Sequence, residues 1–75
     1  MIPYNNIHGN SGVKNYEIIP QGIALEFEDG AIYVYTDTKT GKNRIAKMKQ
    51  LAQKGLGLAT FISKEVRERF AEKIR

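Results

Sequence analysis

The chain has 75 residues, 12 Lys and Arg against 8 Asp and Glu, and a formal net charge of +4. A chain of this length buries only about 60% of the surface that it exposes when unfolded, so we expect one small domain spanning residues 1–75. It contains no Cys, which excludes disulfides and thiolate-bound metals and favours the cytoplasm. No signal peptide is recognised, and no apolar run approaches the roughly 20 residues of a membrane span, so we expect no membrane contact.

Residues 1–12 are rich in Asn, Gly and Ser after position 4, which predicts an irregular lead-in. Three β-like segments follow within residues 13–36. The turn Pro20-Gln21-Gly22 separates the first two segments, and Asp29-Gly30 is a strong hairpin signal between the second and the third. Residues 13–36 therefore predict a three-stranded antiparallel meander.

The register of the last hairpin has two alternatives. A two-residue turn at residues 29–30 turns Tyr33 and Tyr35 away from the core. A three-residue loop at residues 28–30 places Leu25 opposite Tyr33 and turns both tyrosines inward. Periodicity within the strands is compatible with either register.

Residues 41–75 predict two helices. In the first, the apolar side chains recur at three- and four-residue spacing until Gly55, as on one face of an amphipathic helix. These are Ile45, Met48, Leu51 and Ala52. The second helix has an apolar stripe formed by Leu58, Ile62, Val66, Phe70 and Ile74. The expected fold is α+β, a three-stranded antiparallel meander followed by two helices packed on one face (β-β-β-α-α).

The charge is unevenly divided along the chain. Residues 1–35 carry a net charge of −3 and residues 36–75 a net charge of +7, with no acidic residue from Thr38 to Lys64. Lys and Arg that neutralise phosphates supply most of the affinity of proteins for nucleic acids. The first helix has a purely cationic outer face. Such a face predicts a nucleic-acid interface or, alternatively, a solvated helix face without a binding role. The candidate binding residues are Lys42, Arg44, Lys47, Lys49, Lys54 and Arg67.

Catalytic and metal chemistry find little support in the sequence. His8 is the single imidazole, and with no Cys in the chain neither a set of three or four metal ligands nor a nucleophile with an oriented base can be assembled. We therefore interpret His8 as a loop histidine. The sequence predicts a protein that is not an enzyme and that has no catalytic residues, metal or cofactor.

Several short motifs together resemble the KTSC domain, a family named for its occurrence at the C-terminus of some lysyl-tRNA synthetases. The matching residues are Ser11-x-Val13, Tyr16, Leu25-x-Phe27, Gly30, Tyr33-x-Tyr35 and Ser63-x-x-Val66-Arg67-x-x-Phe70. The resemblance covers about residues 11–70 and implies a small accessory domain associated with RNA. It also favours the bulged hairpin with inward tyrosines. The chain departs from the family pattern at residues 36–43, where the usual Val-Pro is replaced.

Two functions from different classes follow. The first is a KTSC-like accessory domain that contacts the phosphates of RNA or DNA through the basic helix face. The alternative is a protein–protein interaction module or a small dimeric adaptor without a nucleic-acid role. In one register, Ile32 and Val34 would form an exposed apolar strip for such a partner.

Overall fold

The computed structural model describes residues 1–7, 9 and 11–75. Within them, the strands of one antiparallel sheet lie in the order β1-β2-β3-β4-β5. These are β1 (Ile2–Pro3), β2 (Val13–Ile19), β3 (Gly22–Phe27), β4 (Ile32–Thr36) and β5 (Glu72–Lys73). The helical elements are α1 (Asp37–Thr40), α2 (Lys42–Lys54), α3 (Leu58–Phe61) and the π-helix η1 (Ile62–Val66). The interpretation of His8 falls outside the described residues.

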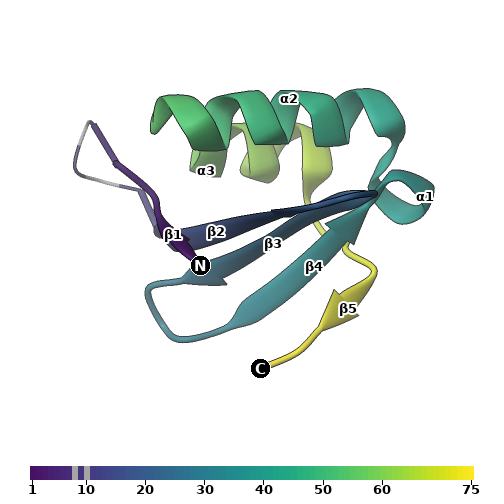
Figure 1. Cartoon of the computed structure of the whole chain (residues 1–75), viewed down its shortest axis with the longest axis horizontal. Helices are drawn as coiled ribbons and strands as arrows, with labels where there is room; N and C mark the ends of the chain where they lie inside the picture. Colours follow the sequence, from purple (N-terminus) through teal and green to yellow (C-terminus); the bar gives the residue numbers. More distant parts are fainter. Residues whose placement is uncertain (8, 10) are drawn as a thin grey trace.

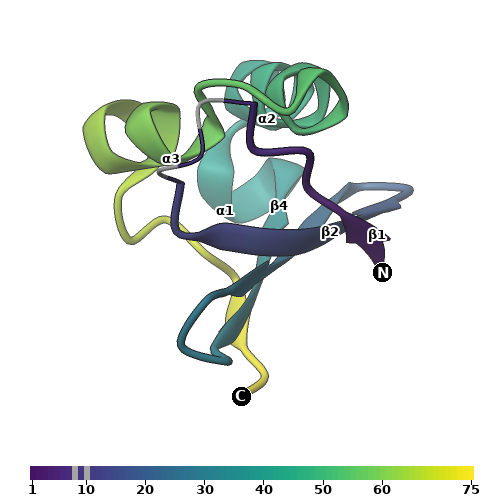
Figure 2. The same ribbon diagram turned by 90° about the vertical axis from the view of Figure 1, so that its left-hand side faces the viewer.

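The helices α2 and α3 lie on one face of the sheet (Figures 1 and 2). The α+β class is therefore confirmed, and β2, β3 and β4 form the central meander. The predicted count of three strands and two helices agrees only roughly, because two short strands extend the sheet. One of them, β1, lies in the lead-in that was predicted to be irregular, where Ile2 pairs with Tyr16 and Pro3 with Asn15.

The hairpin between β3 and β4 adopts the three-residue alternative. Leu25 lies opposite Tyr33, and the backbone N–H of Phe27 donates to the carbonyl of Ala31 at 2.8 Å. Gly30 has a φ of 90°, a conformation that glycine adopts without steric cost. The register therefore turns Tyr33 and Tyr35 toward the helical layer, as the family resemblance implied.

The core lies between the sheet and the helices and continues into an aromatic cluster. The ring of Phe70 lies edge-on to that of Tyr33, with centroids 4.7 Å apart, and also contacts Tyr35 at 6.5 Å. Such edge-to-face pairs are favourable because the positive ring edge meets the negative ring face. The main core side chains, which are fully or almost fully buried, are Val13, Tyr16, Ile23, Leu25, Tyr35, Ile45, Met48, Ala52, Leu58, Ile62 and Val66.

The second predicted helix is shorter than the sequence indicated. Helical structure ends at Val66, and Arg67 takes a positive φ of 54° that redirects the chain toward the sheet. The prediction that Phe70 and Ile74 continue the helical stripe is therefore wrong. Phe70 packs into the aromatic cluster, whereas Ile74 is 59% exposed. Pairing of β5 with β4, together with burial of Phe70, compensates for the lost helical turns.

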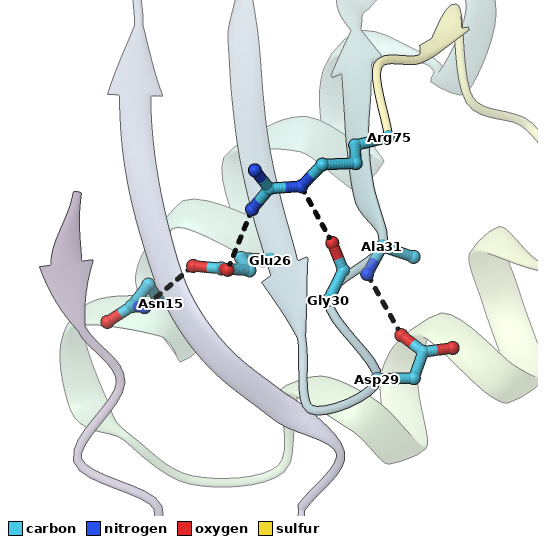
Figure 3. A network of polar contacts seen from close by, with 6 residues as sticks. All are labelled: Asn15, Glu26, Asp29, Gly30, Ala31 and Arg75. Carbon is cyan, nitrogen blue, oxygen red and sulfur yellow. Dashed lines mark hydrogen bonds and ion pairs between the residues drawn. The ribbon is translucent and has the colours of Figure 1, made fainter.

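The end of this segment is fixed to the face of the sheet opposite the helices (Figure 3). The guanidinium of Arg75 forms an ion pair with Glu26 at 3.4 Å and donates to the carbonyl of Gly30 at 3.3 Å. The other carboxylate oxygen of Glu26 accepts a hydrogen bond from the side-chain amide of Asn15 at 2.8 Å. These contacts connect β2 and β3 with Arg75, the second residue after β5.

Candidate nucleic-acid interface

The helix α2 is held over the sheet by one apolar stripe. Ile45, Met48 and Ala52 are buried and face the sheet. The helix ends at Lys54 and is capped by Gly55, whose left-handed conformation (φ 72°) lets the backbone N–H of Leu56 turn back to the carbonyl of Leu51 at 3.4 Å. Because the buried stripe fixes the rotation of the helix, it also determines which side chains face outward.

The four lysines of α2 lie outside its buried stripe, and we call them the basic face. Lys42, Lys47 and Lys54 are exposed, and Lys49 is half-buried. At about 100° per residue, Lys42 and Lys49 follow one flank of the outer surface and Lys47 and Lys54 follow the other. Uncharged side chains, including Gln50, lie between the two flanks. The members of each pair are separated by about 10 Å along the helix axis.

None of these ammonium groups is paired with a carboxylate. In residues 1–7, 9 and 11–75, the one ion pair joins Arg75 and Glu26, on the opposite face of the sheet. The glutamates of the neighbouring helical segment, including Glu65, therefore do not mask the lysines of α2. Unpaired ammonium groups on one surface add to a local positive potential that attracts anions.

Arg44 has a structural role that the sequence did not reveal. Its Nε donates to the backbone carbonyl of Glu65 at 2.9 Å, and its Nη1 donates to the carbonyl of Thr40 at 3.4 Å. Arg44 thus holds α2 against the end of η1, where its charge also complements the negative end of the helix dipole. Its position beside the apolar stripe of α2 is the one sequence signal for this role.

Arg67 lies on a different element from the other candidates. It caps the C-terminal end of η1, is exposed, and donates its backbone N–H to the carbonyl of Ile62 at 2.6 Å. The expectation that it continues a helix is wrong, for the reason given above. Arg67 lies two residues after Glu65, whose carbonyl accepts from Arg44, so both arginines lie at the C-terminal end of η1. The predicted residues therefore comprise the basic face of α2 and two arginines at the end of η1.

Tyr33 and Tyr35 do not form a stacking platform for bases. Tyr35 is 3% exposed, and Tyr33 is enclosed by Phe27, Phe70 and the ammonium of Lys73, which lies 5.7 Å from its ring centroid. Both rings serve packing, as in the register alternative that turns the two tyrosines inward.

The described part of the chain contains no group of three or more His, Asp or Glu side chains that could hold a metal ion. It also contains no helix of the length and apolarity that a membrane span requires.

The chain has no match among protein-family models, curated proteins or solved structures.

Proposed function

We propose that the chain is a small KTSC-like accessory domain that binds RNA, or another nucleic acid, through the basic face of α2. The resemblance of Tyr33-x-Tyr35 and Val66-Arg67-x-x-Phe70 to the KTSC pattern supports the class. The observation that carries the binding function is that four lysines, three of them exposed, lie outside the buried stripe of one helix, and none of them is paired with a carboxylate.

The chemistry of this surface favours phosphate contacts over base recognition. A lysine ammonium acts as a compact point charge and lacks the planar, two-pronged geometry with which arginine reads guanine. Phosphate contacts set the position of a protein on a nucleic acid and carry no sequence information directly. We therefore expect binding that is strongly salt-dependent and weakly sequence-specific.

Titration of the protein with a short fluorescent RNA, followed by anisotropy at several salt concentrations, tests the proposal. If four lysines each displace one counterion, the logarithm of the affinity falls against the logarithm of salt with a slope of about −3. The double variant Lys47→Glu, Lys54→Glu should abolish binding and remain folded, because both side chains are exposed. Affinity that does not change with salt would remove the proposal.

A matched control separates the basic face from net charge. The double variant Lys14→Glu, Lys73→Glu changes the charge by the same amount at exposed positions on β2 and β5. It should retain most of the affinity. Equal losses in the two double variants would mean that net charge, and not the surface of α2, determines binding.

A second function, a protein-interaction module, is favoured by an exposed apolar pair. Ile2 lies opposite Tyr16, so Ile18 is its diagonal neighbour on the same face of the sheet, and the two isoleucines are 53% and 38% exposed. Ile32 and Val34, which the sequence suggested as an exposed apolar strip for a partner, are both half-buried. Sedimentation of the wild type and of Ile18→Lys, with and without RNA, distinguishes the two functions. A tight wild-type dimer that does not bind RNA, and that dissociates in the variant, would favour this second function.

A further inference from the structure

A hollow of about 370 Å³ opens where the lead-in meets the turn between α2 and α3. The backbone N–H of Ile7 donates to the carbonyl of Gly55 at 2.8 Å and fixes the lead-in to this turn. Gly55 permits the approach, because a Cβ there would collide with Asn5. The walls of the hollow include Tyr4, Asn6 and Ser11 from the lead-in, and Gly57, Ala59 and Thr60 from the turn and α3.

The lead-in wall offers hydrogen-bond donors. The hydroxyl of Tyr4 accepts from the backbone N–H of Leu58 at 3.2 Å, which leaves its own proton to donate. The carbonyl oxygen of the Asn6 side chain accepts from the N–H of Ser11 at 3.0 Å, so the amide nitrogen is the remaining polar atom of that side chain. The Ser11 hydroxyl accepts from Val13 at 3.1 Å and also keeps a proton to donate.

Two exposed lysines are close in the sequence to residues that line the hollow. Lys54 directly precedes Gly55, which lines the hollow, and it ends one flank of the basic face. Lys64, in η1, follows the lining residue Thr60 by four positions. A second hollow of about 390 Å³ has the opposite character, because Glu28 and Asp29 line it and would repel phosphate.

We propose that the first hollow receives one unpaired base of single-stranded RNA, while the phosphates on either side of that base contact Lys54 and Lys64. This inference rests on the proposed function and adds that the strand is unpaired. The volume falls in the range of about 300–1,000 Å³ that is usual for small-ligand sites. The donors of Tyr4, Asn6 and Ser11 match the carbonyl oxygens and ring nitrogens on the base edges that unpaired RNA exposes.

The test compares three RNAs and two variants. The wild type should bind a short single strand about tenfold more tightly than a duplex of equal length or the same strand with abasic sites, as expected for one captured base. Thr60→Leu places a larger aliphatic side chain, which cannot stack on a base, at the exposed rim of the hollow and should remove this preference. Gln53→Leu, at an exposed position of α2 that does not line the hollow, is the matched control and should keep it.

An NMR titration of the wild type with the single strand provides a readout that needs no variant. The backbone amide signals of Gly57, Ala59 and Thr60 should shift with the single strand and stay in place with its abasic form. If all three RNAs bind equally, these signals stay unchanged, and Lys47→Glu, Lys54→Glu still weakens binding, the hollow is not a base site although the phosphate surface remains. If none of the RNAs binds, the proposed function fails together with this inference.

Discussion

The side-chain hydroxyl of Thr40 donates a 2.6 Å hydrogen bond to the backbone carbonyl of Arg69. Thr40 is the last residue of α1 and is 2% exposed. Arg69 belongs to the segment that returns from η1 to β5. The bond therefore joins this returning segment to the start of the helical layer, across 29 residues of chain.

Thr40→Val tests this contact, because valine keeps the shape of threonine and removes the hydroxyl. The carbonyl of Arg69 then loses its protein donor, and we expect the free energy of unfolding in urea to fall by about 1–2 kcal/mol. Thr38→Val is the matched control, since Thr38 is exposed on the same short helix, and it should change stability by less than about 0.5 kcal/mol. Similar values for both variants would mean that the bond contributes nothing.

Phe70 and Ile74 should respond in opposite ways to truncation. Phe70→Ala removes a ring that packs on Tyr33 and Tyr35, and since Phe70 is half-buried we expect a loss of about 2–3 kcal/mol. Ile74→Ala removes a side chain that is 59% exposed, and we expect little change. Thermal or urea unfolding measures both. Equal losses would instead support a helix that continues through both residues.

Gly22 is the glycine whose replacement should be most harmful. A Cβ at this position would overlap the backbone carbonyl oxygen of Tyr35, which cannot move without breaking the ladder between β3 and β4. We expect Gly22→Ala to lower stability by about 3 kcal/mol. Gly12→Ala is the control, because a Cβ there meets no atom within 4 Å. A well-folded Gly22→Ala variant with wild-type stability would contradict the close approach of the strands.

Tyr35 should make stability depend on pH under alkaline conditions. Burial, and to a smaller extent the nearby Tyr33, raises the pKa of Tyr35 from 10.0 to about 12. Above about pH 10 the unfolded chain releases this proton while the folded chain keeps it, so ionisation favours unfolding. The contribution is complete below the unfolded pKa and is lost as the pH rises through the folded pKa.

Urea unfolding of the wild type and of Tyr35→Phe between about pH 9 and about pH 12 measures this loss. The comparison is needed because other groups also titrate in that range. The wild type should lose more stability than the variant over the interval. Parallel curves would show that Tyr35 does not ionise differently in the folded and unfolded states.

The central meander could be predicted because its turn residues and alternating side chains are local signals. The register could not be predicted from those signals, since a slip by one residue preserves the alternation. Gly30 resolves the choice by adopting a positive φ in the bulged loop. The strands β1 and β5 are two residues each, which is too short for any periodicity to indicate them.

The end of the second helix was hidden for a different reason. Val66 and Phe70 keep the four-residue spacing of a helix, and no Gly or Pro marks a stop between them. The chain leaves the helix because Phe70 can pack between the sheet tyrosines, a tertiary effect that local spacing does not encode. The lysines of α2 could be predicted because the rotation of the helix follows from its own apolar stripe, which is a local pattern. The contact of Arg44 with Glu65 could not, because it joins two elements that are distant in the sequence.

The outermost strands have a consequence for how copies of this protein meet. Pro3 in β1 has no N–H to offer, and β5 carries the charged side chains of Glu72 and Lys73 on its two residues. A neighbouring chain that paired with β1 would find one backbone donor missing, and a chain that paired with β5 would approach charged side chains. Both borders therefore disfavour the strand-by-strand stacking through which fibrils grow.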